Sequence, residues 1–273
     1  MSARSRAALV QAVDPNRLSE LFPTDEFVRW QLGTAAMDEV GEHRRSSAAW
    51  RLGAAWAQLD DFGGRSRLVL GGRPADAAAL LRDLVPGTIR PDRMSVVRAA
   101  VALLPESLRP VGGDDWDWFT TTAAPLMPLP GEDLVTRINL RQFGELSSVV
   151  DLLHQHSPRY SRDPRDATAA WWAIPDATAE LAAARPAGAA LAAVVAVEPL
   201  PRAVHLASLA TRTEARGRGL ASALVAAVTR ASLAAGRQAV VLGMYADNDA
   251  ARRMYRRLGF AETHHWRSGH LPC

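Results

Sequence analysis

Two glycines separated by one arginine are the residues whose spacing says most about chemistry. They lie in the run Arg216-Gly217-Arg218-Gly219-Leu220-Ala221, between a predicted strand over 203–211 and a predicted helix from about residue 220. Glycine has no Cβ, so backbone N–H groups in such a turn can approach a phosphate, and the helix N-terminus adds its positive dipole end. The run therefore predicts an anion site without a metal. A plain tight turn is the alternative, and a dinucleotide fingerprint is disfavoured because its third glycine is absent.

A second group of residues lies on the next predicted helix. Asn248 and Asp249 are capping types at its start, and Gly259 can end it with Phe260 placed for the contact that accompanies such an ending. Tyr255 lies between these ends, and a phenol that is protonated near neutral pH can donate a proton to a leaving group. Its helical spacing also fits a core tyrosine, and that alternative stays open.

Taken together, the two segments resemble the GNAT superfamily of N-acetyltransferases. The first fits that family's Arg-x-x-Gly-x-Gly/Ala loop at Arg216, Gly219 and Ala221. The second fits its Asn-x-x-Ala-x-x-x-Tyr-x-x-x-Gly-Phe helix, and the resemblance covers about the last half of the chain. It implies an α/β fold (α+β layered) in which a mixed, splayed central sheet is flanked by helices.

The resemblance also implies where an acyl-CoA would bind. The parallel strands 203–211 and 239–245 are expected to splay and admit the pantetheine arm, and Tyr255 is expected to protonate the departing thiolate. The implied cofactor-binding residues are Leu209, Ala210, Thr211, Arg216, Gly217, Arg218, Gly219, Leu220, Ala221 and Asn248. The implied reaction moves an acetyl or other short acyl group from acetyl-CoA or a similar thioester to a primary amine by direct attack.

A general base is needed because a primary amine is protonated at neutral pH. His205, in the strand before the glycine run, is the first candidate, since some members of the family carry a catalytic histidine there and an unperturbed imidazole has a pKa of about 6.5. A core histidine that is merely hydrogen-bonded is an equally weighted reading. Glu198, acting through a water, is the second candidate.

Other polar clusters carry weaker predictions. His264 and His265 are adjacent in a strand and so point to opposite faces, and we predict no metal. Four arginines on the helix that holds Tyr255 predict a solvated helix face, with contact to an adenosine phosphate as the minor alternative. These are Arg252, Arg253, Arg256 and Arg257.

The chain is predicted to hold two domains, residues 1–122 and 134–273, joined by a proline-rich linker at 123–133. In the first domain we expect a strand at 67–70, a Gly71-Gly72 turn into a helix, and a further helix over 96–104. Trp116 and Trp118 should share one strand face. This domain is interpreted either as a degenerate GNAT-like copy or as an unrelated α/β domain, with a weak architectural likeness to glycine N-acyltransferases. It would shape the acceptor pocket or a dimer surface.

Composition limits the classes of function. The 273 residues include no lysine, so the 32 basic residues are arginines set against 29 acidic ones, and a net charge of +3 does not favour nucleic-acid binding. The longest apolar stretch, 187–197, is short of the roughly 20 residues of a membrane helix. The single Cys273 favours a reducing, cytoplasmic setting.

Two classes of function remain after the sequence is read. The first is the N-acyltransferase, with a small-molecule or peptide amine as acceptor and a homodimer left open. The second is a non-catalytic acyl-CoA-binding or sensing module. That module would keep residues 216–221 and make Tyr255 dispensable.

Overall fold

The computed structural model describes residues 9–32, 45–62, 65–85, 87–166, 168–176, 188 and 190–272, so Cys273 lies outside the described residues. The chain forms two compact units. Unit 1 holds residues 1–118, 244–248 and 263–273, and unit 2 holds 119–243 and 249–262. The sequence-based boundaries lay at residues 122 and 134, whereas the structure groups the last strand of the chain with unit 1.

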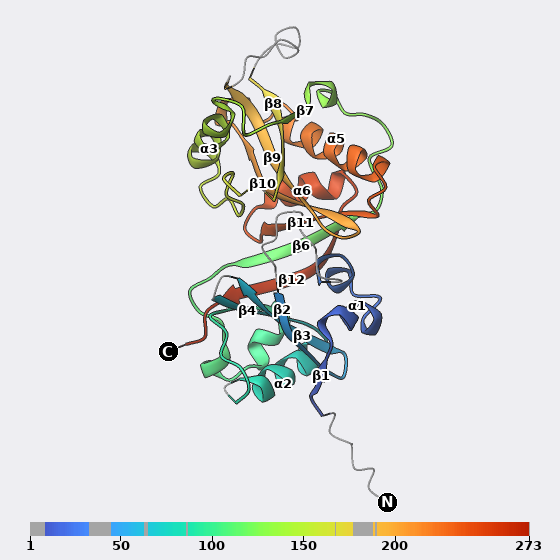
Figure 1. Ribbon diagram of the computed structural model, residues 1–273, viewed down its shortest axis with the longest axis vertical. Helices are drawn as coiled ribbons and strands as arrows, with labels where there is room; N and C mark the ends of the chain where they lie inside the picture. The colour runs from blue at the N-terminus through green and yellow to red at the C-terminus, as the bar shows by residue number, and fades with distance from the viewer. Residues whose placement is uncertain are drawn as a thin grey trace, which may run out of the picture. The chain divides into compact units, whose positions relative to one another are not determined.

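Unit 1 is a sheet with one long helix against it (Figure 1). Its strands β1 to β4 pair antiparallel in chain order, α2 then connects β4 to the parallel strand β5, and β12 pairs antiparallel with β5. Its elements are β1 (Gln11–Val13), α1 (Leu18–Leu21), β2 (Arg45–Leu52), β3 (Ala55–Phe62), β4 (Arg65–Gly72), α2 (Pro74–Leu84), β5 (Arg93–Val97), β6 (Asp115–Thr121) as far as Trp118, and β12 (Ala261–Gly269) from Thr263, with short 3₁₀ or π turns at Pro15–Arg17, Val28–Leu32, Arg98–Leu103 and Glu106–Leu108.

Unit 2 is a mixed sheet with the strand order β11-β10-β9-β8-β7; among its described strands β10 and β11 run parallel and the other neighbours pair antiparallel. Helix α3 packs on β9 and β10 on one face, while α5 covers β8 to β10 on the other (Figure 1). Its elements are β7 (Thr136–Ile138), α3 (Glu145–His156), β8 (Ala170–Pro175), β9 (Leu191–Pro199), β10 (Ala203–Thr211), α5 (Leu220–Ala234), β11 (Ala239–Tyr245) and α6 (Asp249–Arg257), with 3₁₀ turns at Glu132–Leu134 and Thr213–Ala215. The predicted α/β class with a mixed sheet flanked by helices is confirmed.

The two units repeat one order of elements. Each has a short strand, a helical segment, three antiparallel strands, a crossover helix and a strand parallel to the third. The parallel ladders also have the same length, running from Arg67↔Arg93 to Leu70↔Val96 in unit 1 and from Ala203↔Ala239 to Leu206↔Leu242 in unit 2. Residues in the two units can therefore be matched by their position in these ladders.

The helix predicted over 96–104 is confirmed only in part, at Arg98–Leu103, where it is a 3₁₀ helix. Val96 and Val97 end strand β5, where they pair with Arg267 and Trp266 of β12, and a 3₁₀ helix follows at Arg98–Leu103. β-Branched residues pack well on a pleated surface, and the partner strand comes from the far end of the chain. Local periodicity therefore carries no sign of this strand.

Aromatic side chains fill the interior of unit 1. Trp116 and Trp118 lie on one face of β6, as predicted, with ring centroids 6.4 Å apart. Phe27 contacts both rings and also Trp266, and Trp56 is 6.0 Å from Trp266. Because Trp118 is only 2% exposed, its role in this structure is packing. Among the described residues, no helix combines the length and the apolar character that crossing a membrane requires.

Candidate active site

The parallel pair β10–β11 opens in its second half. Cα partners run from Ala203↔Ala239 to Leu206↔Leu242, and β10 then continues to Thr211 beyond the last of these partners. On its other side β10 carries a bulge, since Ala207 faces Ala196 and the next pair is Ala210↔Val194. An extra residue on one strand bends that strand and re-aims its backbone. The opening therefore begins where the resemblance placed a splay.

Ser208 is the residue at the centre of this bulge. Its φ of 51° lies in the left-handed region, which a residue other than glycine rarely adopts. Its hydroxyl accepts a hydrogen bond from Arg162 N at 2.7 Å and donates one to Arg162 O at 3.2 Å. The bonds attach the segment after α3 to β10. Sequence reasoning missed Ser208, because serine gives no signal for a left-handed position.

Leu209, Ala210 and Thr211 form the end of β10 after the bulge. Ala210 and Thr211 pair with Val194 and Ala193 of β9, so their backbone is held on that side. The side that faced β11 earlier in the strand has no β11 partner here. Such an edge can pair with another extended chain, as the predicted pantetheine contact requires.

The glycine turn precedes α5 and is open. Gly217 and Gly219 have φ values of 76° and 80°, and a Cβ built at either one meets no atom within 4 Å. Gly219 caps α5, whose first turn contains no acidic residue. The N-terminal N–H groups and the helix dipole are therefore available to an anion, and the residues fit a pyrophosphate.

Hydrogen bonds with the end of α3 and the end of β10 hold this turn in place. Arg216 NH2 donates to His156 O at 2.9 Å, and its Nε donates to Thr211 O at 3.3 Å. His156 Nδ1 lies 3.0 Å from Thr213 Oγ1 and accepts from Thr213 N at 3.3 Å. Arg218, by contrast, is exposed. In this structure Arg216 ties the turn to the end of β10 and to α3.

His205 and Glu198, the two candidate bases, face each other. They are direct partners in the antiparallel pair β9–β10, and His205 Nδ1 lies 3.0 Å from Glu198 Oε2. Arg162 Nε donates to the other oxygen of Glu198, and Arg162 NH1 pairs with Asp166. Burial alone would raise the pKa of Glu198, but the hydrogen bonds and charges of His205 and Arg162 outweigh burial and lower it to about 2.

Tyr255 is buried in α6 between two aromatic rings. Its ring centroid is 5.9 Å from that of Phe119 and 5.7 Å from that of Phe260. Burial raises the pKa of the phenol above its ordinary value, so the hydroxyl is protonated at neutral pH. Gly259, with φ of 86°, ends the helix as predicted, and Phe260 N donates back to Tyr255 O at 3.0 Å.

Asn248 is grouped with unit 1, directly before the start of α6. Its backbone N–H donates to Tyr245 O at 3.1 Å within that segment. The other predicted site residues all belong to unit 2. The structure therefore brings His205 together with Glu198, and the glycine turn together with the end of β10, while Asn248 is described only within its own unit.

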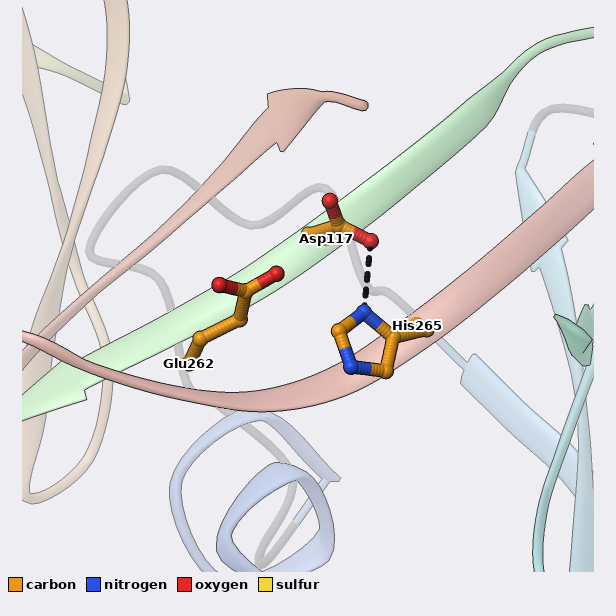
Figure 2. A group of neighbouring side chains, drawn as sticks. All are labelled: Asp117, Glu262 and His265. Carbon is orange, nitrogen blue, oxygen red and sulfur yellow. Dashed lines mark hydrogen bonds and ion pairs between the residues drawn. The ribbon is translucent and has the colours of Figure 1, made fainter. Parts of the chain in front are cut away.

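The prediction of a solvated arginine face on α6 is wrong for Arg252. Its side chain is 16% exposed and forms an ion pair with Glu262, which also forms an ion pair with Arg256 NH2. In unit 1, Asp117 is likewise held by Arg98 at 2.7 Å and by His265 Nδ1 at 2.8 Å, the bond drawn in Figure 2. Each carboxylate already has hydrogen-bond and ion-pair partners in its own unit, and we propose no metal site at either one.

Comparison with known proteins agrees with this geometry. Residues 146–260 match the family model described as the acetyltransferase (GNAT) family. No curated protein matches the chain. Among solved structures, a GNAT-family acetyltransferase from Colwellia psychrerythraea is similar at 11% identity, over 94% of this chain and 97% of that one, with a TM-score of 0.51. A Drosophila protein is similar at 13% identity, over 80% of this chain and 77% of that one, with a TM-score of 0.50.

A GCN5-related N-acetyltransferase from Sphaerobacter thermophilus is also similar, at 16% identity over 97% of this chain and 95% of that one, with a TM-score of 0.48. At such identities these likenesses concern the fold alone. The family assignment rests on the match over 146–260, which covers β8 to β11 and α5 together with the glycine turn and Tyr255. Residues 146–260 therefore belong to a domain of the acetyltransferase (GNAT) family.

Proposed function

We propose that the protein is an N-acyltransferase that moves an acetyl or other short acyl group from CoA to a primary amine in a ternary complex. The observation that carries the proposal is the open turn at Gly217 and Gly219, which lies between α5 and the end of β10 that has no β11 partner. An anion site and an unpaired strand edge in this order suit a ligand with a pyrophosphate and an extended amide-bearing arm.

The chain's own groups supply the binding. Backbone N–H groups from Gly217 to Ala221 would hold the pyrophosphate, and the main chain of 209–211 would pair with the arm. The bound thioester supplies an acyl group that is activated toward an amine. Every other contribution is positioning and proton transfer by protein side chains.

His205 is favoured over Glu198 as the base. With a pKa of about 2, Glu198 is ionised at neutral pH and takes a proton poorly. It accepts a hydrogen bond from His205 Nδ1–H instead, since the two atoms lie 3.0 Å apart. Nε2 is then the nitrogen that takes the proton from the attacking amine. Glu198 thus orients His205 as the carboxylate of a catalytic triad orients its histidine.

Tyr255 is the proposed donor to the departing sulfur. Because burial raises the pKa of its phenol, the hydroxyl remains a donor throughout the pH range of catalysis. The same raised pKa makes full release of the proton costly, since it would leave a buried phenolate. Tyr255 therefore acts mainly by donating a hydrogen bond to the developing thiolate and keeps its own proton, while the released thiolate takes a proton from solvent.

Isothermal titration with acetyl-CoA and with free CoA tests the proposal. Gly219→Trp should abolish binding, because its side chain would project into the open turn. Gly236→Trp is the matched control: Gly236, at the other end of α5, also has a positive φ of 86° and open space around it. Equal loss in both variants would point to strain alone. No binding by the folded wild type would contradict the proposal.

The non-catalytic acyl-CoA module is distinguished by turnover. A wild type that binds acetyl-CoA but releases no thiol with any member of an amine library would be such a module. Thiol release that depends on Tyr255 and His205 would identify the enzyme. The library should include small amines and peptides.

A further inference from the structure

The side chain of Arg162 links two carboxylates beside the candidate base. We propose that Arg162 is a positioning residue, which fixes the orientation and the tautomer of His205 through Glu198. The catalytic meaning of this inference rests on the proposed function, whereas the arrangement of the three side chains can be tested without any substrate. Arg162 lies in the segment between α3 and β8, outside every motif of the sequence.

One carboxylate, that of Glu198, contacts both Arg162 and His205. Glu198 Oε1 accepts a hydrogen bond from Arg162 Nε, and Glu198 Oε2 lies 3.0 Å from His205 Nδ1. The three side chains are 30%, 14% and 18% exposed for Arg162, Glu198 and His205 respectively, so solvent screens them weakly. A carboxylate with both oxygens engaged has little freedom to rotate. Its second oxygen therefore fixes the plane and the direction of the imidazole.

Arg162 is itself fixed at several points. Its backbone N–H and C=O both bond to Ser208 Oγ, three residues along β10 from His205. Its NH1 pairs with Asp166, whose Oδ1 accepts from Thr168 N at 3.0 Å and from Thr168 Oγ1 at 2.8 Å. Arg162 is thus fixed at its backbone by Ser208 and at its guanidinium by Asp166. Its position relative to Glu198 does not depend on a single flexible side chain.

This geometry selects one tautomer of His205. An ionised carboxylate is a hydrogen-bond acceptor only, so the nitrogen that faces it must carry a proton. In the neutral ring Nδ1 is then protonated and Nε2 is the acceptor, as the proposed reaction requires. Removing Arg162 would free Glu198 Oε1 and let the carboxylate rotate away from His205. The hydrogen bond that selects the Nδ1–H form would then be made less often, and the tautomer preference would weaken.

The tautomer can be read from the ¹⁵N shifts of His205 in the substrate-free protein near pH 8, with the signal assigned from His205→Gln. We expect the Nδ1–H form in the wild type. In Arg162→Gln its share should fall several-fold. Arg162→Lys should recover only part of it, because lysine lacks the fork that bridges two carboxylates.

Arg165→Gln is the matched control, since Arg165 lies in the same segment, is 61% exposed and pairs only with Asp163 among the described ion pairs. It should leave the His205 signals unchanged. An Nε2–H tautomer in the wild type, or identical signals in Arg162→Gln and the wild type, would overturn the inference. If Arg162→Gln does not fold, Arg162→Lys replaces it, measured at a pH high enough to deprotonate the lysine. His205 ¹⁵N signals identical to those of the wild type under that condition would also overturn the inference.

A second arm measures activity. Arg162→Gln should lower kcat for thiol release about tenfold or more while leaving the acetyl-CoA affinity unchanged, because the residue does not touch the glycine turn. An unchanged kcat contradicts a positioning role. If the wild type releases no thiol with any amine, the proposed function fails, and the tautomer measurement still decides whether Arg162 sets His205.

Discussion

Val69 lies directly opposite Gln58 in the antiparallel pair β3–β4, at the ladder positions that His205 and Glu198 hold in β9–β10. Val69 and His205 are each the third rung of the parallel ladder of their unit. A valine cannot accept a proton, so unit 1 repeats the strands around the proposed base without the base. This match supports the interpretation of unit 1 as a degenerate copy.

The connection from the third antiparallel strand to the crossover helix also differs between the two units. Two residues beyond the ladder, Gly72 has φ of 95° and Ser208 has φ of 51°. After Gly72 only Arg73 precedes α2, whereas residues 209–219 separate Ser208 from α5. The start of α2 is also occupied, because Asp76 accepts from Ala54 N at 2.9 Å. The Gly71-Gly72 turn is thus equivalent to the bulge and not to the glycine turn of unit 2.

We therefore expect one acetyl-CoA site per chain. Titration calorimetry should give a stoichiometry close to one, and Gly219→Trp should remove all binding instead of half of it. A Gly72 variant is unsuitable here, since a Cβ at Gly72 would lie 2.1 Å from Ala54 O and disturb the fold. Two sites per chain, or residual binding of half the wild-type amount, would show that unit 1 also holds the ligand.

Removing the hydroxyl of Tyr255 tests its role apart from packing. Tyr255→Phe keeps the ring between Phe119 and Phe260, so the free energy of unfolding should change little. The rate of thiol release should fall about 10²-fold, the usual order for a lost acid catalyst. A colorimetric assay of the released CoA thiol at saturating acetyl-CoA measures this rate. A wild-type rate in Tyr255→Phe would mean that Tyr255 is a core residue whose role is packing.

Ser208 offers a test that separates backbone strain from hydrogen bonding. Ser208→Gly relieves the left-handed strain but loses the two bonds to Arg162, whereas Ser208→Ala loses the bonds and keeps the strain. We expect the glycine variant to be more stable than the alanine variant by about 1 kcal/mol. Urea unfolding measures the difference. Equal stabilities would mean that φ at this position costs nothing.

Sequence alone predicted the elements that contact one another locally. The bounds of β10 and β11 match their predicted ranges, and α5 begins at Leu220 as its apolar stripe and the glycine turn indicated. The short connection Glu198-Pro199-Leu200-Pro201-Arg202 between two apolar runs also predicts the antiparallel pairing of β9 with β10, and this prediction is confirmed. Glu198 and His205 were named separately as bases, but their register fixes them as one pair.

The remainder of the site depends on distant contacts. Strands β2 and β3 were not predicted, although their side chains complete unit 1. Arg162 and Ser208 had no motif around them, because their bond joins positions 46 residues apart. Whether an arginine in a loop meets a buried carboxylate is set by packing. No local pattern of residue types reports it.

Asp25 predicts a pH dependence of stability in unit 1. Its Oδ1 lies 3.1 Å from His264 Nε2, and its Oδ2 accepts from Trp56 Nε1 at 2.8 Å. Burial would raise the pKa of Asp25, but the bond and charge of His264, with donors at Val28 and Trp56, lower it below the ordinary 3.8. A folded-state pKa below the unfolded value stabilises the fold above that value, and the stabilisation is lost as pH falls through the folded pKa.

Asp25→Asn should therefore lower the free energy of unfolding by about 2 kcal/mol at pH 7, the order for a charged hydrogen bond between buried groups. The gap to the wild type should stay constant down to about pH 5 and shrink below pH 4, because the wild-type carboxylate is then protonated as well. Urea unfolding at a series of pH values gives this gap. Asp83→Asn, at an exposed position on α2 of the same unit, is the control and should show almost none. A gap for Asp25→Asn that persists undiminished at pH 3 would mean that shape, and not the charge of the carboxylate, accounts for its contribution.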